Sequence, residues 1–191
     1  MDYLYEQLHH WRNVSRRSLI VIAAVVVVVA AVAGLFLLAP SGREIKLEMM
    51  EFSFNGTSGG PVIKAKVGET IKIVLTNKGV VVHEFMIVKD LEGFREALGK
   101  TVDMLREKGL DEEAITNSNE LHLVHHAYIA VEPMVGWFRE HHIMLKSGES
   151  ATLTVTFDRP GTYYYVCASL SGTFPKSHID RGMYSTIIVE G

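Results

Sequence analysis

The hydrophobic residues of this chain follow two different patterns before and after residue 40. Residues 19–39 form an apolar run of 21 residues without a charged side chain. At a rise of about 1.5 Å per residue, a helix of this length spans a hydrocarbon core of roughly 30 Å. The apolar region of a secretory signal is shorter, about 7–15 residues. The run therefore predicts a retained transmembrane helix, with a cleaved signal as the alternative.

The charges beside this run indicate its orientation. Arg12, Arg16 and Arg17 precede it closely, whereas Arg43 and Lys46 follow it more sparsely. By the positive-inside rule, residues 1–18 form a cytoplasmic segment and residues 40–191 an extracytoplasmic domain. We therefore expect a single-pass protein of the cell membrane.

Beyond residue 40, apolar and polar residues alternate with a period of two. The pattern is clear in segments 45–49, 71–75 and 153–157, and turn signals such as Asn77-Lys78-Gly79 separate such segments. Period-two alternation places one face of a strand in a core and the other in water. The sequence predicts an all-β sandwich of seven or eight short strands.

Residues 90–142 interrupt the strand pattern. Asp90 can cap a helix whose apolar positions recur at offsets of three and four, and Gly109 is a natural stop; these positions are Leu91, Phe94, Leu98, Val102 and Leu105. Residues 111–127 are predicted to be helical in part. Because strand signals resume at 143–157, we interpret residues 90–142 as a partly helical insertion that covers one side of the sandwich and shapes a docking surface.

The candidate chemistry lies near the C-terminus. Cys167, the only cysteine, ends the predicted strand 161–167, and His178 and Met183 follow before the predicted strand 184–190. His83 lies on a strand of its own. Two imidazoles, one thiolate and a weak axial thioether are the ligands of a blue copper electron-transfer site. The sequence therefore predicts one type 1 copper ion per chain.

These residues resemble those of cupredoxins, small Greek-key β-sandwich copper proteins, over residues 44–90 and 143–190. The family order implies that His83, Cys167, His178 and Met183 are the copper ligands. Segment 52–60, FSFNGTSGG, is similar to the early part of sulfocyanins, membrane-bound cupredoxins of archaea. The resemblance implies that His178 lies near the surface and serves as the electron port, ringed by residues such as Leu170, Phe174 and Pro175.

The ligand region departs from the family pattern in two places. The Cys167–His178 spacing is longer than usual, so we expect the extra residues, including Gly172 and Pro175, to bulge out as a surface loop. The residue after the first histidine is usually Asn or Ser, which braces the ligand loop, and here it is Glu84. Partners around the ligands orient them, so Glu84 bears on the potential and stiffness of the site.

Five further histidines lie in the insertion: His122, His125, His126, His141 and His142. The segment supplies no obvious cysteine or carboxylate to complete a ligand set, and its spacing matches no zinc pattern. We expect a structural or partner-facing role, with a second copper or zinc site as the alternative. Asn55-Gly56-Thr57 is both a glycosylation sequon and a turn signal.

Composition narrows the function. A net charge of −3 gives no nucleic-acid footprint. A single cysteine excludes an internal disulfide and argues against a dinuclear copper centre, which needs two bridging cysteines. No nucleophile-base pair or carboxylate dyad stands out, so we expect neither an enzyme nor a small-molecule substrate.

We therefore expect a membrane-anchored electron carrier. The sulfocyanin resemblance implies a bc-type complex as electron donor and a haem-copper terminal oxidase as acceptor. Three alternatives are a cupredoxin subunit permanently docked in a respiratory oxidase, a copper enzyme with a second metal site in the histidine-rich insertion, and a copper chaperone or sensor.

Overall fold

The computed structural model of the protein describes residues 42–57 and 59–191. The predicted cytoplasmic segment 1–18 and transmembrane helix 19–39 lie outside these residues. Within the described part of the chain, none of the helices combines the length and the apolar character that crossing a bilayer requires.

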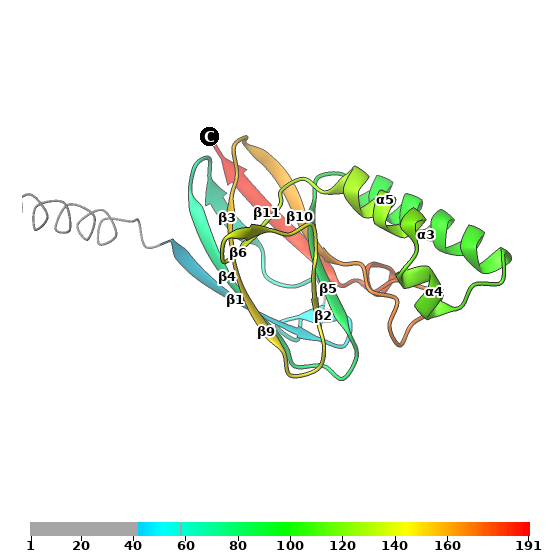
Figure 1. Ribbon diagram of the computed structural model, residues 1–191. Helices are drawn as coiled ribbons and strands as arrows, with labels where there is room; N and C mark the ends of the chain where they lie inside the picture. Colours follow the sequence, from blue (N-terminus) through cyan, green and yellow to red (C-terminus); the bar gives the residue numbers. More distant parts are fainter. Residues whose placement is uncertain (1–41, 58) are drawn as a thin grey trace, which may run out of the picture. The chain divides into compact units, whose positions relative to one another are not determined.

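Two mixed sheets form the body of the domain (Figure 1). The first sheet has the order β2-β1-β4-β9-β6-β7, with bounds β1 Arg43–Met50, β2 Ser53–Phe54, β4 Thr70–Asn77, β6 Met134–Val135, β7 Phe138–Arg139 and β9 Ser150–Thr156. The second has the order β3-β11-β10-β5-β8, with bounds β3 Ile63–Lys66, β5 His83–Val88, β8 Ile143–Leu145, β10 Gly161–Cys167 and β11 Tyr184–Glu190. This two-sheet arrangement agrees with the predicted all-β class.

The main core lies between the two sheets and follows the period-two pattern. Alternate residues of β1, β4 and β9 are buried there, among them Leu47, Ile73 and Leu153. From the second sheet, Phe85 and Tyr165 stack with ring centroids 6.1 Å apart. Because successive side chains on a strand point to opposite faces, the alternation alone fixes which residues enter this core.

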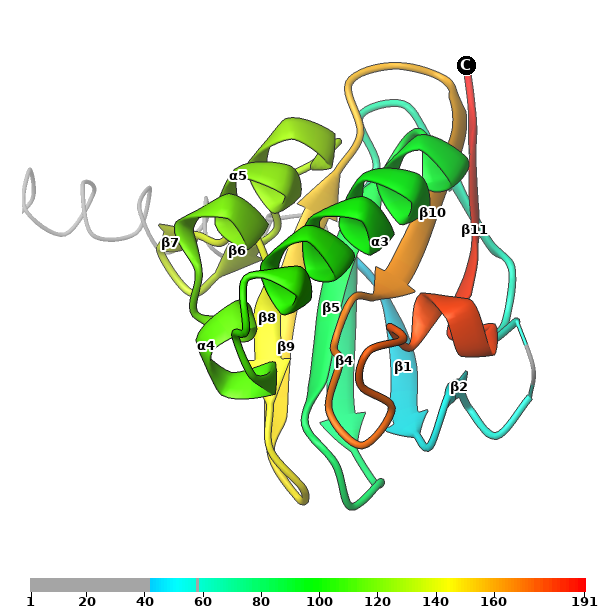
Figure 2. The ribbon, with the colours of Figure 1, turned by 90° about the vertical axis from the view of Figure 1, so that its right-hand side faces the viewer.

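Strand β5 is buried on both of its faces. Phe85 and Ile87 belong to the core between the sheets, whereas Met86 and Val88 belong to a second core. The second core exists because helices cover the outer face of this sheet (Figure 2). A strand covered on both faces reads as a continuous apolar run, which the segment FMIV shows.

The covering helix α3, Leu91–Glu107, has the predicted form. Its N-cap is Asp90, whose side chain accepts a hydrogen bond from the amide of Gly93. All five predicted apolar positions are buried, and Gly109 follows the helix with a φ of +87°. The expectation that the insertion covers one side of the sandwich is confirmed.

The rest of the insertion is partly helical, as predicted, and adds strands that the sequence did not indicate. Two shorter helices follow, α4 at Glu112–Thr116 and α5 at Asn119–Tyr128, with Asp111 and Ser118 as their N-caps. The β6–β7 hairpin then joins the first sheet, where Met134 pairs with Thr154 of β9. With the two-residue strands included, the described chain has eleven strands rather than seven or eight.

An ion pair connects the helical insertion to the segment that follows Cys167. Arg95 of α3 donates from Nε to Asp180 Oδ1 at 2.8 Å. Asp180 lies in the short 3-10 helix η2, Ile179–Arg181, and its other carboxylate oxygen accepts from the amide and hydroxyl of Ser177. The helix that covers the sheet thus also holds the loop that carries His178.

Candidate metal centre

Three predicted ligands meet at one end of the second sheet. His83 begins β5 and Cys167 ends the antiparallel neighbour β10, where Cys167 pairs with Phe85. His178 precedes η2 in the loop between β10 and β11. The strand register therefore brings together side chains that are far apart in sequence, and all three are fully buried.

The donor atoms of these residues surround a common point. The Nδ1 atoms of His83 and His178 are 3.1 Å apart, and Cys167 Sγ lies 3.6 Å and 3.2 Å from them. Ligands bound at about 2.0–2.3 Å in a tetrahedral arrangement stand roughly 3.3–3.6 Å from one another. The three atoms are thus spaced for one metal ion.

The protonation states of the three side chains suit metal binding. Burial and the neighbouring imidazole of His178 lower the pKa of His83 to about 4. Burial likewise lowers the pKa of His178, although its bond to the Ser171 carbonyl opposes the shift. Both rings are therefore neutral near pH 7. Burial raises the pKa of the Cys167 thiol to about 12, so an ion must displace the thiol proton on binding.

Hydrogen bonds orient the two donors from the C-terminal half. His178 Nε2 lies 2.7 Å from the Ser171 carbonyl, which fixes the proton on Nε2 and leaves the Nδ1 lone pair for a metal. Cys167 Sγ accepts from the Glu84 amide at 3.3 Å. These partners set the direction of each ligand before a metal binds.

Met183 lies beside this group in the core. Its side chain is fully buried and belongs to the same core cluster as Cys167, whose amide donates to the Met183 carbonyl at 3.0 Å. The Met183 amide in turn donates to the His178 carbonyl. Two imidazoles, a thiolate and a nearby thioether fit one type 1 copper ion, because this soft mixed set serves both Cu(I) and Cu(II).

The expectation of a surface-near His178 is not met, because the exposed fraction of its side chain is 0%. The Phe52 ring lies edge-on against it, with centroids 5.1 Å apart. The extra residues between Cys167 and His178 form the predicted loop, with Gly172 exposed, but the loop also folds back over the imidazole through Ser171. The Ser171 carbonyl and the Phe52 ring together cover the imidazole.

Two side chains brace the ligand loops, a role that the sequence did not indicate for either. Asn77, fully buried, donates to the carbonyls of Val81 and Leu145 and accepts from the Gly79 amide. Ser169 donates from its hydroxyl to the Val82 carbonyl at 2.7 Å. The sequence predicts only a turn at Asn77, whereas its burial and hydrogen bonds show that it holds the loop before His83.

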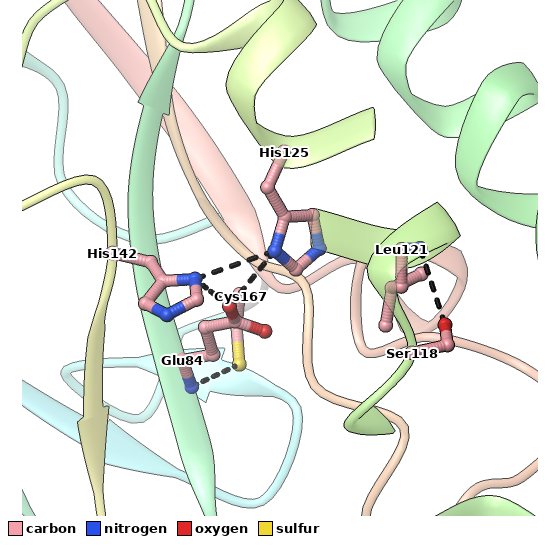
Figure 3. A network of polar contacts seen from close by, with 6 residues as sticks. All are labelled: Glu84, Ser118, Leu121, His125, His142 and Cys167. Carbon is pink, nitrogen blue, oxygen red and sulfur yellow. Dashed lines mark hydrogen bonds and ion pairs between the residues drawn. The ribbon is translucent and has the colours of Figure 1, made fainter. Parts of the chain in front are cut away.

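Glu84 has a different role from the Asn or Ser that it replaces. Its side chain points to the opposite face of β5 from His83 and lies with His125 and His142 under α5 (Figure 3). The insertion itself supplies no carboxylate to this pair of histidines, as expected, yet the pair has one. The carboxylate comes from β5, outside the insertion, and no sequence spacing could have paired it with these histidines.

Neither a protein-family profile nor a curated protein matches this sequence. Among solved structures, a dithionite-reduced auracyanin from the photosynthetic bacterium Roseiflexus castenholzii is 20% identical, with a TM-score of 0.47 and coverage of 78% of this chain and 98% of that chain. Auracyanin A, a "blue" copper protein from Chloroflexus aurantiacus, is 18% identical, with a TM-score of 0.47 and coverage of 77% and 99%.

Copper enzymes are also among the similar structures. The copper nitrite reductase from Nitrosomonas europaea is 20% identical, with a TM-score of 0.43 and coverage of 78% of this chain and 42% of that chain. Likenesses at this level do not assign a function. A copper centre is instead indicated by the distances between the donor atoms of His83, Cys167 and His178.

Proposed function

We propose that this chain is a membrane-anchored blue copper protein that carries single electrons in a respiratory chain. The observation that carries the proposal is the convergence of two imidazole Nδ1 atoms and one sulfur, all within 3.6 Å of one another, inside a rigid sandwich. Together with the nearby Met183 thioether, these donors would hold a copper ion of the blue type.

Copper, when bound, supplies reversible one-electron chemistry. The role of the chain is to hold the ligands still. His83 and Cys167 lie on neighbouring strands, and Asn77 and Ser169 fix the adjoining loops. Because the surrounding core is close-packed, the ligands move little when the charge changes, and the energy of reorganisation stays small.

The partner surface that we propose lies at the copper end of the sandwich. Val80 is 80% exposed and follows Gly79, whose Cα faces the His83 ring. An exposed apolar residue in the loop that leads to a ligand suits brief contact with a redox partner. Both copper-ligand imidazoles are buried, so we assign electron exchange to the loop before His83, which carries this exposed residue.

The membrane anchor and the partners rest on the sequence. The 21-residue uncharged run at 19–39 supports anchoring, which confines diffusion to two dimensions and raises the rate of encounter with integral complexes. We propose a bc-type complex as donor and a haem-copper oxidase as acceptor. The test is stopped-flow reduction and oxidation of the copper-loaded full-length chain by each purified complex, and failure with both would overturn this assignment.

The copper assignment is tested by the visible spectrum of the copper-loaded full-length chain. We expect a strong thiolate-to-copper band that disappears in Cys167→Ala. Met183→Leu should keep the band but change its position and the reduction potential, whereas Met144→Leu, at a half-exposed position on β8, should change neither. A colourless oxidised protein, or equal effects of the two methionine variants, would contradict the proposed site.

A further inference from the structure

We propose that Glu84, His125 and His142 form a second metal site, for a divalent transition-metal ion of the zinc type, on the outer face of the second sheet. His83 and Glu84 are successive residues of β5, so their side chains point to opposite faces of the sheet. The proposed second site thus lies across one strand from the copper ligands, beneath α5.

Three elements contribute one ligand each (Figure 3). Glu84 comes from β5, His125 from the last turns of α5, and His142 from the residue before β8. Because β8 pairs with β5, with Met144 opposite Glu84, His142 lies on the same face as Glu84. The sheet register and the position of α5 together bring the three side chains to one point.

The ligand atoms have the spacing of a metal site. Glu84 Oε1 lies 2.7 Å from His142 Nδ1 and 3.3 Å from His125 Nδ1, and the two Nδ1 atoms are 3.3 Å apart. Tetrahedral ligands bound to zinc at about 2.0–2.1 Å stand roughly 3.3 Å apart. Two of the three distances match this value, whereas the third, between Glu84 Oε1 and His142 Nδ1, is shorter and must lengthen when an ion enters.

The cluster is buried and its polar atoms are incompletely satisfied. Glu84 is 5% exposed and His125 is 3% exposed. Among the described residues, Glu84 Oε1 has no hydrogen-bond partner with acceptable geometry, although the Nδ1 atoms of both imidazoles lie close to it. A buried carboxylate is costly without a partner, and a cation between the oxygen and the two nitrogens would supply one.

A simpler reading of the same contacts is an ion pair between Glu84 and a protonated His142. The Glu84 carboxylate, 2.7 Å from Nδ1, raises the pKa of His142, which favours such a pair. Burial lowers the pKa of His125, however, so its ring is neutral and offers a lone pair. Beside such an ion pair a neutral His125 can only approach Glu84 through Nδ1 at 3.3 Å, whereas in a metal site the same Nδ1 is a third ligand.

The ligand set indicates the class of metal. Two imidazoles and one carboxylate suit Zn²⁺ or Cu²⁺, and three protein ligands leave a fourth position open. His122 belongs to the same histidine group, with its ring centroid 5.8 Å from that of His142. No soft ligand is present in the trio, so Cu(I) is not favoured there.

The proposed site is connected to the copper ligands through Glu84. The Glu84 amide donates to Cys167 Sγ, and Glu84 follows His83 directly. A cation on the Glu84 carboxylate adds positive charge near the sulfur, which favours the reduced copper site and raises its potential. This consequence rests on the proposed function, whereas metal binding by the trio does not. By linkage, Zn²⁺ should bind more tightly when the copper is Cu(I).

The experiment uses the full-length chain with its copper site filled and reduced, which keeps Zn²⁺ out of that site. Zn²⁺ is titrated against a chromophoric chelator, and bound metals are counted after desalting. We expect one zinc per chain besides copper. His142→Gln should lose zinc affinity about 10- to 100-fold or more. The matched control is His141→Gln, which removes the neighbouring histidine, paired with Glu132, and should bind zinc normally.

Three results would overturn the proposal: no zinc beyond the copper site, equal affinity in the two variants, or zinc binding that needs Cys167. If His142→Gln does not fold, the visible spectrum of Co²⁺ added to the wild-type chain with Cu(I) bound tests the site instead. Four-coordinate cobalt with nitrogen and oxygen ligands has visible bands, whereas hexaaqua cobalt is nearly colourless. A spectrum without such bands would overturn the proposal. A chain that lacks the blue band but binds zinc through His142 would refute the proposed function and leave the second site standing.

Discussion

Replacing Gly79 by alanine should disturb the copper centre through a single methyl group. A Cβ at this position would lie 2.9 Å from His83 Nε2 and 2.7 Å from Glu51 Oε1. Gly79 is not in the left-handed region of φ, so alanine meets no backbone strain there. Glu51 is exposed and can swing away, whereas the His83 ring is fully buried. The His83 ring therefore receives the collision.

The Gly79 backbone cannot easily retreat from this contact. Its amide donates to Asn77 Oδ1 at 2.8 Å and to the Met49 carbonyl at 3.1 Å, and its carbonyl accepts from Ser147 Oγ at 2.7 Å. Atoms in ordinary contact lie about 3.5–4.0 Å apart, so the His83 ring must move by roughly 0.6–1.1 Å. Metal sites tolerate deviations of only about 0.2 Å.

The free-energy cost of displacing the His83 ring can be estimated. Overpacking a close-packed site by one methyl group costs about 1–3 kcal/mol. If the copper-bound chain is destabilised by this amount relative to the metal-free chain, copper affinity falls by about 5- to 150-fold, because 1.4 kcal/mol corresponds to a tenfold change in affinity. The visible band should shift as well, because the position of one imidazole around the ion changes.

The assay is competition for Cu(I) by a chelator, together with the visible spectrum of the oxidised chain. The matched control is Gly99→Ala in α3, where no atom lies within 4 Å of the added Cβ. Alanine in a helix interior stabilises by about 0.5–1 kcal/mol relative to glycine, without effect on copper. If Gly79→Ala binds copper as tightly as Gly99→Ala, with the same band, then His83 Nε2 does not face Gly79.

Two further predictions concern stability. Phe94 of α3 is fully buried in the second core, so Phe94→Ala should lower the free energy of unfolding by about 3–5 kcal/mol in urea denaturation. A loss below about 1 kcal/mol would mean that α3 does not pack on the sheet. In the metal-free chain, the pKa of His83 is about 4, against about 6.5 when unfolded. The unfolded state therefore binds more protons in this window, and about 3 kcal/mol of stability is lost as the pH falls from about 6.5 to 4. Urea midpoints that stay constant or rise on acidification over this range would contradict the burial of a neutral His83.

The sequence by itself determined the features that depend on local pattern. Period-two alternation identified β1, β4 and β9, and the offsets of three and four identified α3 with its cap at Asp90. The strands 161–167 and 184–190 coincide with β10 and β11. These predictions of strands and helix succeeded because the burial of each residue follows from the periodicity of its own element and does not depend on distant segments. The ligand types likewise identified the candidate chemistry before any distance was known.

Only the tertiary structure decided what lies on each face of β5. His83 and Glu84 are neighbours in sequence, yet the pleat sends one toward Cys167 and the other toward His125 and His142. Which helix covers the outer face, and which histidines it brings, depends on long-range packing that no local pattern encodes. The burial of His178 beneath its long loop and the bracing by Asn77 have the same origin. They arise from contacts between segments that meet only when the two sheets and the helices pack together.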